Sequence, residues 1–555
     1  MKLSIPNFAL IVLIGPSGSG KSTFARKHFP HTAVLSSDFC RGLVSDDENN
    51  QAATTDAFEV LHYIAAKRLS AGLTTVIDAT NVQPEMRKAF VALAREHDVL
   101  PVAIVLNVPE EVCHSRNKER PDRDFGPHVV RNQISQLRRG IRGLDREGFR
   151  YVHVLKTAAE VDAVTFDQQP LYNDRRHDRG PFDIIGDLHG CTAELFSLLE
   201  KLGYQKGDAH DWLPPAGRKA VFLGDLCDRG PDSVGVLKTT MAMTAAGHAM
   251  CVPGNHDVKL LRHLRGKKVQ LTHGLAQTVE QLEQEPPEFH DAVAKFLDSL
   301  ISHYVLDGGD LVVAHAGMLQ KYIGRASGRV REFAMYGETT GEIDEFGLPV
   351  RLNWAAEYRG PAHVIYGHTP VPEADWLNRT LNIDTGCCFG GKLTALRWPE
   401  RDIVSVPAAR TYAEPARPFL HDVTSRTAQQ EHDDVLDLAD VTGKRLVQTR
   451  LQQNVTIGEH HAAAALEVMS RFAIDPRWLI YLPPTMSPTE ASALPGLLEH
   501  PAEAFSYFRK QGVETVVCQE KQMGSRAVVV VCRDEAAVAK RFGVGAGYGI
   551  IFTRT

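Results

Sequence analysis

The sequence predicts a multidomain α/β protein, and two observations carry that prediction. Short β-rich runs alternate with helical patterns through most of the chain, which is the pattern of parallel α/β sheets. The chain has 555 residues, too many for a single hydrophobic core. Roughly three or four domains are therefore expected.

The first predicted domain covers residues 1–166. Its strand candidates, with helical patterns between them, are Phe8–Ile14, Ala33–Leu35, Thr74–Ile77, Val102–Leu106 and Tyr151–Leu155. Residues 167–180 are polar and unpatterned, so they are predicted to form a linker. A second α/β domain is expected at 181–404, then a linker at 405–435 and a C-terminal segment at 436–555 that ends in a β-rich piece.

Composition and charge exclude several classes of protein. Hydrophobic residues make up 43% and charged residues 23% of the chain, close to soluble globular averages. No apolar run is long enough to span a membrane, and the nine cysteines form no C-x-x-C pair, so a cytoplasmic protein is expected. With a formal net charge of −6, any nucleic-acid binding must come from local basic patches.

A phosphate-binding loop is predicted where the first strand meets the first helical pattern. In such loops backbone N–H groups wrap the phosphates, the lysine reaches the β- and γ-phosphates and the hydroxyl after it binds Mg²⁺. ATP and Mg²⁺ are therefore the predicted ligands. The residues that satisfy G-x-x-x-x-G-K-[ST], with the first helical residue after them, are Gly15, Gly18, Gly20, Lys21, Ser22 and Thr23.

Two acids that follow neighbouring strands are candidates for transferring the phosphoryl group to an acceptor. Transfer to a hydroxyl needs a base near that hydroxyl and cations along the phosphoryl group. Asp38 follows the second strand, with Arg41 three residues later, and is predicted to be the base. Asp78 ends the third strand and is placed near the metal. Either acid alone could instead be a helix cap or a solvated turn residue.

A cluster of arginines supplies the basic patch that the net charge requires. Arg116 and Arg120 lie in a polar stretch and are candidates for a lid over the donor phosphates. Further arginines on the next helical pattern could contact RNA or could form a solvated charged face.

A second set of polar residues occupies strand exits between residues 182 and 404. The blocks are GDLHG, GDLCDRG and GNHD, followed by two later histidines. Carboxylate, imidazole and amide ligands without thiolates suit Mn²⁺, Fe or Mg²⁺, and a bridging carboxylate suits a pair of such ions. The candidate residues are Asp187, His189, Asp225, Asp228, Arg229, Asn255, His256, His315 and His368. Asp384, after another strand, is a candidate that could also be a turn residue.

The spacing of these blocks resembles the metallophosphoesterase superfamily, in particular its protein-phosphatase-like branch. The resemblance implies that Asp187 and His189 bind a first metal ion and that Asp225 bridges. It implies that Asn255, His315 and His368 bind a second metal ion. It also implies that His256 and Arg229 act on the leaving group and the phosphate.

The C-terminal segment contains the motif K-x-x-G in KQMGSR, with Lys521 as its lysine. This is the nucleophile motif of nucleotidyltransferases that form a lysyl-AMP intermediate, and it is weak on its own. The later motifs of a ligase have no room in the remaining residues, so sealing activity is not expected. The predicted hairpin Val516–Val531 would expose a β-edge, which a homo-oligomer or a separate ligase subunit could cover.

Taken in order, the phosphate loop, the metal blocks and KQMGSR resemble the bacterial polynucleotide kinase-phosphatase of RNA repair. The resemblance spans essentially the whole chain. It implies a P-loop kinase, a calcineurin-like α/β sandwich that acts as a 2′,3′-phosphatase, and part of a nucleotidyltransferase-like α+β domain. It further implies ATP, Mg²⁺ and two divalent ions such as Mn²⁺ as cofactors. RNA or DNA ends are the implied substrates, and a 3′-terminal RNA ribose methyltransferase is the implied partner.

Two other functions are compatible with these motifs. A protein-phosphatase-like or dinucleoside-polyphosphate hydrolase domain could be fused to a small-molecule P-loop kinase. A non-catalytic nucleotide-binding scaffold would require both sets of residues to be idle. The pairing of a 5′-end kinase with a 3′-end phosphatase favours RNA end healing over both.

Overall fold

A computed structural model describes residues 2–119, 126–416, 427–433, 442–447, 455–472, 478, 489–520, 522, 524–542 and 547–553. The chain divides into two compact units, Met1–Asp422 and Val423–Thr555, which are described separately. Within the described residues, no helix has the length and apolar character needed to cross a membrane.

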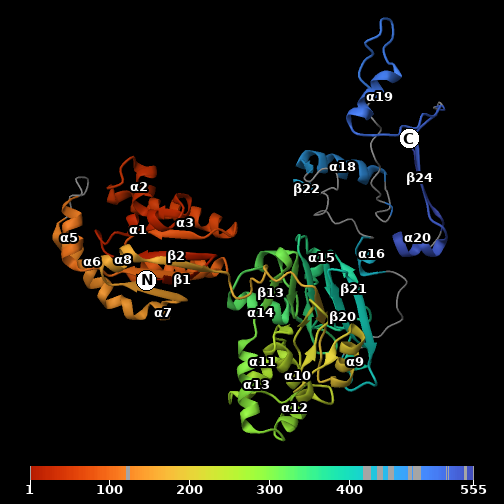
Figure 1. Ribbon diagram of the computed structural model, residues 1–555. Helices are drawn as coiled ribbons and strands as arrows, with labels where there is room; N and C mark the ends of the chain where they lie inside the picture. Colours follow the sequence, from red (N-terminus) through yellow and green to blue (C-terminus); the bar gives the residue numbers. More distant parts are fainter. Residues whose placement is uncertain are drawn as a thin grey trace. The chain divides into compact units, whose positions relative to one another are not determined.

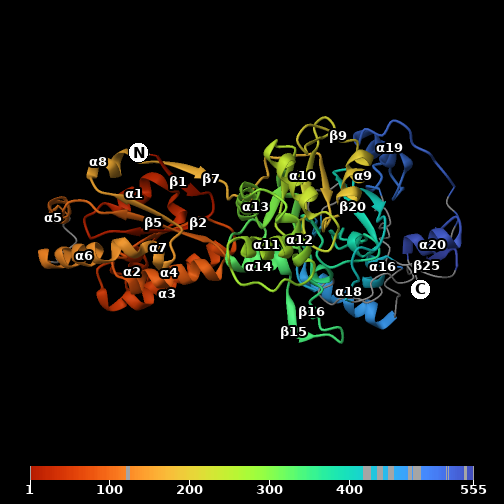
Figure 2. The same cartoon turned by 90° about the horizontal axis from the view of Figure 1, so that it is seen from below.

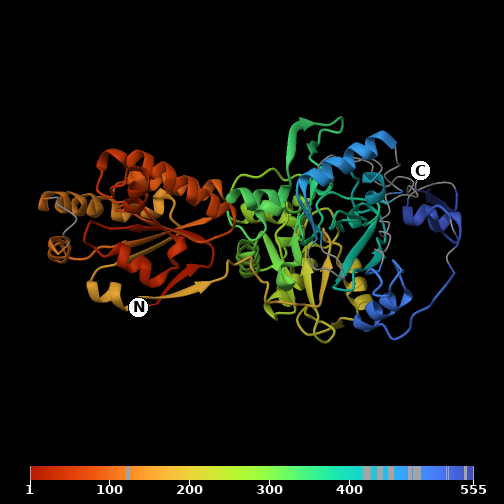
Figure 3. The same cartoon turned by 90° about the horizontal axis from the view of Figure 1, so that it is seen from above.

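The N-terminal part of the first unit is built on a parallel five-stranded sheet with helices on both faces (Figures 1 and 3). The sheet order is β3 (Val34–Ser36), β4 (Thr75–Asp78), β2 (Ala9–Ile14), β5 (Leu100–Leu106) and β6 (Tyr151–Leu155). The helices are α1 (Lys21–His28), α2 (Ser37–Ser45), α3 (Thr54–Ser70), α4 (Pro84–Glu96), α5 (Glu110–Lys118), α6 (Pro127–Gly140), α7 (Leu144–Glu147) and α8 (Ala158–Ala163).

Strand β2 lies at the centre of this sheet and is fully buried. Its alternate side chains enter two different apolar clusters, Leu10 and Val12 on one face and Ile11 and Leu13 on the other. A strand buried on both faces reads as a continuous hydrophobic run, as ALIVLI does. The phosphate loop therefore begins at the end of the central, fully buried strand of the sheet.

The segment predicted as the first linker is ordered. Strand β7 (Thr165–Gln169) crosses the predicted boundary at residue 166 and pairs in parallel with β1 (Lys2–Pro6). Further on, Asn173 is fully buried. Its Nδ2 donates to His303 Nε2 at 2.9 Å and to the carbonyl of Arg325 at 2.8 Å. Polar side chains that find such partners hold an unpatterned segment in place, which a hydrophobicity pattern cannot reveal.

The central domain consists of two packed five-stranded sheets. One has the order β12 (Ala249–Cys251), β11 (Lys219–Phe222), β8 (Phe182–Ile185), β20 (Lys392–Trp398), β21 (Asp402–Pro407). The other has the order β13 (His303–Leu306), β14 (Leu311–Ala314), β17 (His363–Tyr366), β19 (Thr380–Asn382), β18 (Trp376–Leu377). One apolar cluster joins them and includes Ile184 and Val221 from the first sheet and Val313 and Ile365 from the second. The fold is an α/β sandwich.

Helices and small strands complete this domain. They are α9 (Thr192–Leu202), α10 (Ser233–Ala245), α11 (Asn255–Leu264), α12 (Leu275–Leu282), α13 (Pro287–Ser299), α14 (Gly328–Tyr336), α15 (Trp354–Glu357), β9 (Gln205–Lys206) and β10 (Trp212–Leu213). The hairpin of β15 (Thr339–Ile343) and β16 (Pro349–Arg351) stands away from the rest of the domain in Figures 2 and 3. Strand β21 crosses the boundary predicted at residue 404, so the sandwich continues beyond it.

The second unit contains short elements. They are α16 (Ala428–His432), β22 (Arg445–Val447), β23 (Val455–Ile457), α18 (Glu459–Phe472), α19 (Pro501–Lys510), β24 (Ala527–Val531), α20 (Glu535–Phe542) and β25 (Gly549–Thr553). The predicted hairpin Val516–Val531 is wrong, because β24 pairs with β25 and residues 513–520 form no strand. The alternating valines predict a strand but do not identify its partner. The partner of β24 is β25, which follows α20 in the chain. Lys521 lies outside the described residues.

Candidate active sites

The phosphate loop lies between β2 and α1, as the sequence predicts, and its glycines are needed for its shape. Gly18 has φ 79°, and a Cβ there would lie 2.3 Å from the carbonyl oxygen of Cys113. Gly20 precedes α1 with φ 95°. Lys21 is buried, and its Nζ donates to the carbonyls of Gly15 at 2.8 Å and Pro16 at 2.9 Å. The loop thus lies beside a buried ammonium group and the N-terminus of α1.

Strand register brings both predicted acids to the edge of the sheet that carries this loop. Asp78 pairs in register with Leu13 of β2 and with Ser36 of β3, at the carboxyl ends of all three strands. Asp38 lies in the first turn of α2, which begins directly after Ser36. Because parallel strands end at the same edge, the phosphate loop, Asp38 and Asp78 share one side of the sheet.

Arg41 holds Asp38 in place. Its Nη2 donates to Asp38 Oδ1 at 2.7 Å, and its Nη1 donates to the carbonyl of Glu48. Both side chains are largely buried, with 10% and 25% of their surface exposed for Arg41 and Asp38. The two predicted residues therefore form one unit in which the arginine fixes the carboxylate.

Arg116 on α5 reaches the phosphate loop, as a lid residue should. Its Nη1 donates to the carbonyl of Ser19 at 3.4 Å and lies 3.0 Å from the position of a Cβ on Gly20. Gln133 on α6 accepts from the backbone N–H of Ser17 at 2.7 Å. Helices α5 and α6 therefore both contact the loop. Arg120 lies outside the described residues.

The structure also reveals a buried ion pair that sequence reasoning missed. Arg87 is fully buried and makes two bonds to the carboxylate of Glu147, at 2.6 and 2.7 Å. It also donates to the carbonyls of Asn81 and Val82, in the loop after β4. Arg87 thereby fixes the segment that follows Asp78. An isolated arginine on a helical pattern gives no indication of such a role in the sequence.

The predicted metal ligands of the central domain converge on Asp225. Asp225 Oδ2 lies 3.5 Å from His189 Nε2 and 3.5 Å from His315 Nε2. His315 Nε2 is also 3.2 Å from Asn255 Oδ1 and 3.0 Å from His368 Nδ1. Two groups of atoms, one with His189, Asp225 and His256 and one with Asp225, His315 and His368, are each compact enough to hold an ion. Asp225 belongs to both, which is the geometry of a bridging carboxylate.

Backbone carbonyls orient two of the imidazoles. His189 Nδ1 lies 3.1 Å from the carbonyl of Cys227, and His315 Nδ1 lies 2.8 Å from that of Leu223. A proton on each Nδ1 leaves Nε2 free to face Asp225, which is the usual outer contact of a metal-binding histidine.

Burial and charge shape the protonation of this cluster. Burial, with the neighbouring carboxylates of Asp384 and Asp225, raises the pKa of Asp187 well above its usual range. Burial likewise raises the pKa of Asp384 to about 6. Burial opposes ionisation of Asp225 as well, but the surrounding imidazoles, led by His315, outweigh it and lower its pKa. The crowded carboxylates are an environment that a cation would stabilise.

The residues present fit divalent metal ions. The donors are oxygens and nitrogens, most of them on buried residues, and this set suits Mn²⁺, Fe or Mg²⁺. Asp187 Oδ1 and His368 Nε2 are buried atoms without a hydrogen-bond partner among the described residues. Asp187 is nevertheless tied to the cluster, because its Oδ2 accepts from the backbone N–H of His368 at 3.0 Å. Buried polar atoms of this kind are costly unless something binds them.

The loops that carry the cluster have strained backbones. Non-glycine residues with positive φ are uncommon, and at functional sites they mark conformations held by their surroundings. The candidate residues with φ between 40° and 75° are His189, Asp225, Asp228, Arg229 and His368.

Asp228 and Asp257 support this arrangement. Asp228 is fully buried, and its Oδ2 lies 2.6 Å from His256 Nδ1 while its Oδ1 accepts from Thr278 Oγ1 at 2.7 Å. Asp257, which sequence reasoning did not select, accepts from the backbone N–H groups of Leu226 and Gly254. It thereby joins the two loops that carry Asp225 and Asn255. The position of Asp257 in the GNHD block is the sequence signal that could have indicated this role.

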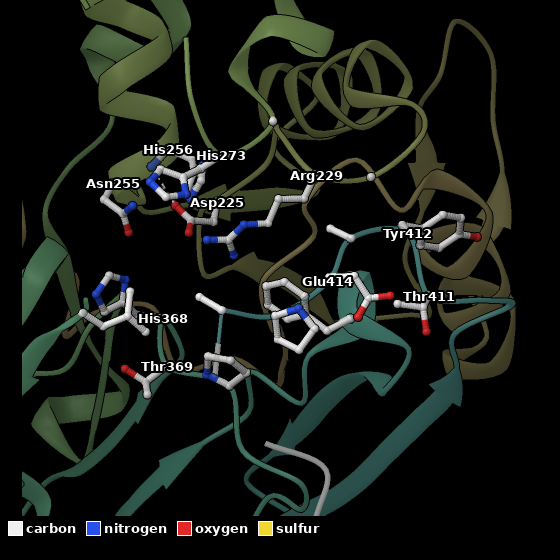
Figure 4. A pocket seen from close by; sticks show the side chains of 18 of the residues that line it. Asp225, Arg229, Asn255, His256, His273, His368, Thr369, Thr411, Tyr412 and Glu414 are labelled. Atoms are coloured by element: carbon white, nitrogen blue, oxygen red, sulfur yellow. Dashed lines mark hydrogen bonds between the residues drawn. The ribbon is translucent and has the colours of Figure 1, made fainter. Parts of the chain in front are cut away.

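The cluster opens into a cavity of about 1290 Å³ (Figure 4). Arg229 lines it next to the cluster, with Nη1 3.0 Å from His189 Nε2. Arg351 from β16 lines the same cavity and contributes to lowering the pKa of His315 and His368, after the larger effect of burial. Sequence reasoning missed Arg351, which lies in no motif and is brought here by the hairpin.

Three family models match the chain in the order that the sequence predicts. An AAA domain matches residues 10–144, a calcineurin-like phosphoesterase matches 180–372, and a PNKP adenylyltransferase domain, described as a ligase domain, matches 464–555. Together, the three matches give the chain the domain architecture of a polynucleotide kinase-phosphatase. It combines a P-loop kinase-like domain with a metallophosphoesterase domain, so the predicted fold class is confirmed. A nucleotide with Mg²⁺ and divalent metals are the cofactors that these two domains imply.

Curated relatives match only part of this family architecture. Bis(5′-nucleosyl)-tetraphosphatase PrpE of Anoxybacillus flavithermus is 48% identical over 244 residues, which are 43% of this chain and 99% of that protein. The PrpE protein of Bacillus subtilis is 44% identical over 237 residues, 42% of this chain and 97% of that protein. A cold-active protein-tyrosine phosphatase of Shewanella sp. has 17% identity and a TM-score of 0.30, over 43% of this chain and 83% of that one, too low a score to support any inference.

Proposed function

We propose that this protein heals RNA ends: it phosphorylates 5′-hydroxyl ends with ATP and removes phosphate from 3′ ends. The observation that carries the proposal is the union in one chain of a P-loop domain, a metallophosphoesterase domain and a PNKP adenylyltransferase match. Ribonuclease cleavage leaves 5′-hydroxyl and phosphorylated 3′ ends, and two such domains together would convert both into ends that can be joined.

In the kinase domain, the proposed base is Asp38, which would accept the proton of the 5′-hydroxyl. Its ion pair with Arg41 fixes the carboxylate, so the base is in place before the acceptor arrives. Lys21 and Arg116, which donate to the loop carbonyls of Gly15 and Ser19, supply positive charge beside the loop, where the donor phosphates would lie. Asp78 is proposed to lie near the Mg²⁺ that Ser22 would bind.

In the phosphoesterase domain, Asp187 and His189 would hold one divalent ion, and Asn255, His315 and His368 a second, with Asp225 between them. Such ions, which we propose to be Mn²⁺, activate water and neutralise phosphate charge. Arg229, which lines the cavity beside His189, would bind the phosphate. His256, positioned by Asp228 at 2.6 Å, would give a proton to the leaving oxygen.

The proposal is tested by offering labelled ATP with 5′-hydroxyl RNA, 5′-hydroxyl DNA and a phosphopeptide in parallel. Label on the oligonucleotides alone is expected. A comparison of RNA with DNA would also show which nucleic acid is preferred. Label on none of them, with turnover of a small metabolite instead, would contradict the assignment.

Metal dependence gives a separate test of the phosphatase. Chelation should stop release of phosphate from a 3′-phosphorylated oligonucleotide, and Mn²⁺ should restore it more fully than Mg²⁺. Activity that survives exhaustive chelation would contradict the proposed metal site.

A second candidate function rests on the relatives named PrpE. These relatives are named bis(5′-nucleosyl)-tetraphosphatases, and they match 42–43% of this chain. Hydrolysis of dinucleoside polyphosphates by the same metal site is therefore the alternative for the central domain. Competition between diadenosine tetraphosphate and a 3′-phosphorylated RNA, at equal concentration, would show which has the larger kcat/KM.

Partners and location are also proposed. The family architecture suggests a cytoplasmic protein that works with a 3′-terminal RNA ribose methyltransferase. A separate ligase subunit or self-association would cover the hairpin of β24 and β25, on which Val529 and Val531 are 56% and 70% exposed. Light scattering of the purified chain, alone and with the methyltransferase, would measure both kinds of association.

A further inference from the structure

The cavity next to the metal cluster extends well beyond the place beside Arg229 where a phosphate would bind. Its volume of about 1290 Å³ exceeds the roughly 300–1,000 Å³ common for small-ligand sites, so binding of one phosphate would leave most of it open. Figure 4 shows Asp225, His256 and His368 on one side and Thr411, Tyr412 and Glu414 on the other, with Arg229 between. All residues from 410 to 416 line it.

These residues belong to a segment after β21 that we call the strap, residues 408–416. It lies in the region that sequence reasoning treated as a linker. The strap is held firmly, because the backbone N–H of Ala409 and the hydroxyl of Tyr412 both donate to Glu194 Oε1, at 2.9 and 2.8 Å. Glu194 itself is only 3% exposed. A buried carboxylate on α9 thus anchors a surface segment.

The backbone of Cys388 and a glycine complete this anchoring. The N–H groups of Tyr412 and Ala413 both donate to the carbonyl of Cys388 at 3.0 Å. Gly390 has φ 87°, and a Cβ there would lie 2.5 Å from Thr411 Oγ1. Close approach of the strap to the loop that follows Asp384 therefore requires glycine at this position. The strap is fixed relative to the metal cluster.

The chemistry of the far end of the cavity differs from that of the metal cluster. Two guanidinium groups of the cavity lie over aromatic rings: Arg410 over Tyr412 at 5.3 Å at the far end, and Arg229, which also contacts the metal cluster, over Phe389 at 5.0 Å. All four residues line the cavity. Aromatic faces next to guanidinium groups bind nucleobases by stacking and bind phosphates by charge, without reading sequence.

We propose that the strap and Phe389 form a nucleotide subsite, which binds the nucleotide that carries the scissile phosphate. This inference rests on the proposed phosphatase function and adds residues that determine its specificity. Arg410 contacts an anionic group of the nucleotide, and the rings of Tyr412 and Phe389 contact its base or sugar. The metal cluster alone would accept any phosphate monoester, whereas the subsite selects nucleotide ends.

The test compares two substrates on the full chain loaded with Mn²⁺: a 3′-phosphorylated oligonucleotide and p-nitrophenyl phosphate, which lacks a nucleotide. Arg410→Ala and Tyr412→Ala are each expected to raise KM for the oligonucleotide about tenfold, the size of one lost stacking or charge contact. Both variants should keep the parent kcat/KM for p-nitrophenyl phosphate. Tyr412→Phe retains the ring but loses the hydrogen bond to Glu194, so it should lose less on the oligonucleotide than Tyr412→Ala and keep the parent value on p-nitrophenyl phosphate.

Arg265→Ala is the matched control, because Arg265 pairs with Asp298 on the surface, is half exposed, and does not line the cavity. Equal loss on both substrates in Arg410→Ala and Tyr412→Ala would overturn the subsite, since it would indicate a structural effect on the metal cluster. No loss on either would also overturn it. If the two variants lost activity on diadenosine tetraphosphate but not on the oligonucleotide, the subsite proposal would be overturned in favour of the second candidate function. A parent enzyme that hydrolyses p-nitrophenyl phosphate and no 3′-phosphate end would instead contradict the proposed function.

Discussion

The two candidate sites of the first unit are built in opposite ways. The phosphoesterase site consists of side chains, with Asp225 within 3.5 Å of two imidazoles and each of them buried. The phosphate loop of the kinase site is mainly backbone, with the side chains of Lys21 and Arg116 bonded to its carbonyls. Metal ions need several close, fixed side-chain donors, whereas phosphates can be wrapped by N–H groups and a helix N-terminus.

This difference has consequences for mutation. Removal of one carboxylate should disable a shared metal cluster, because Asp225 belongs to both ion-binding groups. Removal of one side chain from a loop built of backbone should leave much of the phosphate cradle in place. The sites also share no residue, so each should fail independently of the other.

The largest effect is expected for Asp225→Asn. Loss of the bridging charge should lower kcat/KM for 3′-phosphate release by at least about 10³-fold, with no change in 5′-phosphorylation. Both activities should be measured on the same preparation. Joint loss of the two activities in a folded variant would show that the sites are not independent.

Lys21→Ala should have the converse effect. Loss of the ammonium group should lower the rate of 5′-phosphorylation by roughly 10²–10³-fold, while 3′-phosphate release stays at the parent rate. Single-turnover transfer from labelled ATP measures this directly. Near-normal transfer would show that the loop binds nucleotide without taking part in catalysis.

Arg87→Ala tests the independence of the two domains through the stability of the N-terminal one. It would leave Glu147 buried without its partner, so unfolding of the N-terminal domain should cost about 3–5 kcal/mol less. Hydrogen exchange read separately for residues 2–119 and for the central domain would locate the loss. Arg139→Ala, on the exposed face of α6, should change little. An equal loss of stability in Arg87→Ala and Arg139→Ala would refute the role given to the Arg87 ion pair.

The smallest effect concerns His303 in the central domain. Burial lowers the pKa of His303 from 6.5 to about 3, and Asn173 Nδ2 donates to its Nε2, so the folded state holds a neutral ring. Because the unfolded chain takes up a proton near pH 6.5, stability is present above that pH and lost below it. From about pH 7.5 to about pH 5.5 the central domain should lose about 1.4 kcal/mol through this residue.

His303→Gln keeps an acceptor for Asn173 but does not titrate. Its denaturant midpoint should therefore change less over the same pH interval than that of the parent. Identical pH dependence of the two proteins would contradict the neutral, buried state of His303.

The sequence predicted the parts of both sites that lie in motifs at strand ends. Parallel strands bring their carboxyl ends together, so Lys21, Asp38 and Asp78 could be grouped without coordinates. Arg87 and Arg351 could not be predicted, because burial and the course of a hairpin decide their partners. The sequence predicts a linker where the strap lies, because the anchors of the strap are single polar contacts, such as Glu194 with Tyr412, between residues far apart in the chain.

One RNA that carries both a 5′-hydroxyl and a 3′-phosphate tests the central claim most directly. The parent protein, given ATP, Mg²⁺ and Mn²⁺, should convert it to an RNA with a 5′-phosphate and a 3′-hydroxyl, as read by mass spectrometry of the intact strand. Lys21→Ala should stop only the first change and Asp225→Asn only the second. An RNA left unaltered at both ends, while diadenosine tetraphosphate is hydrolysed, would contradict the account.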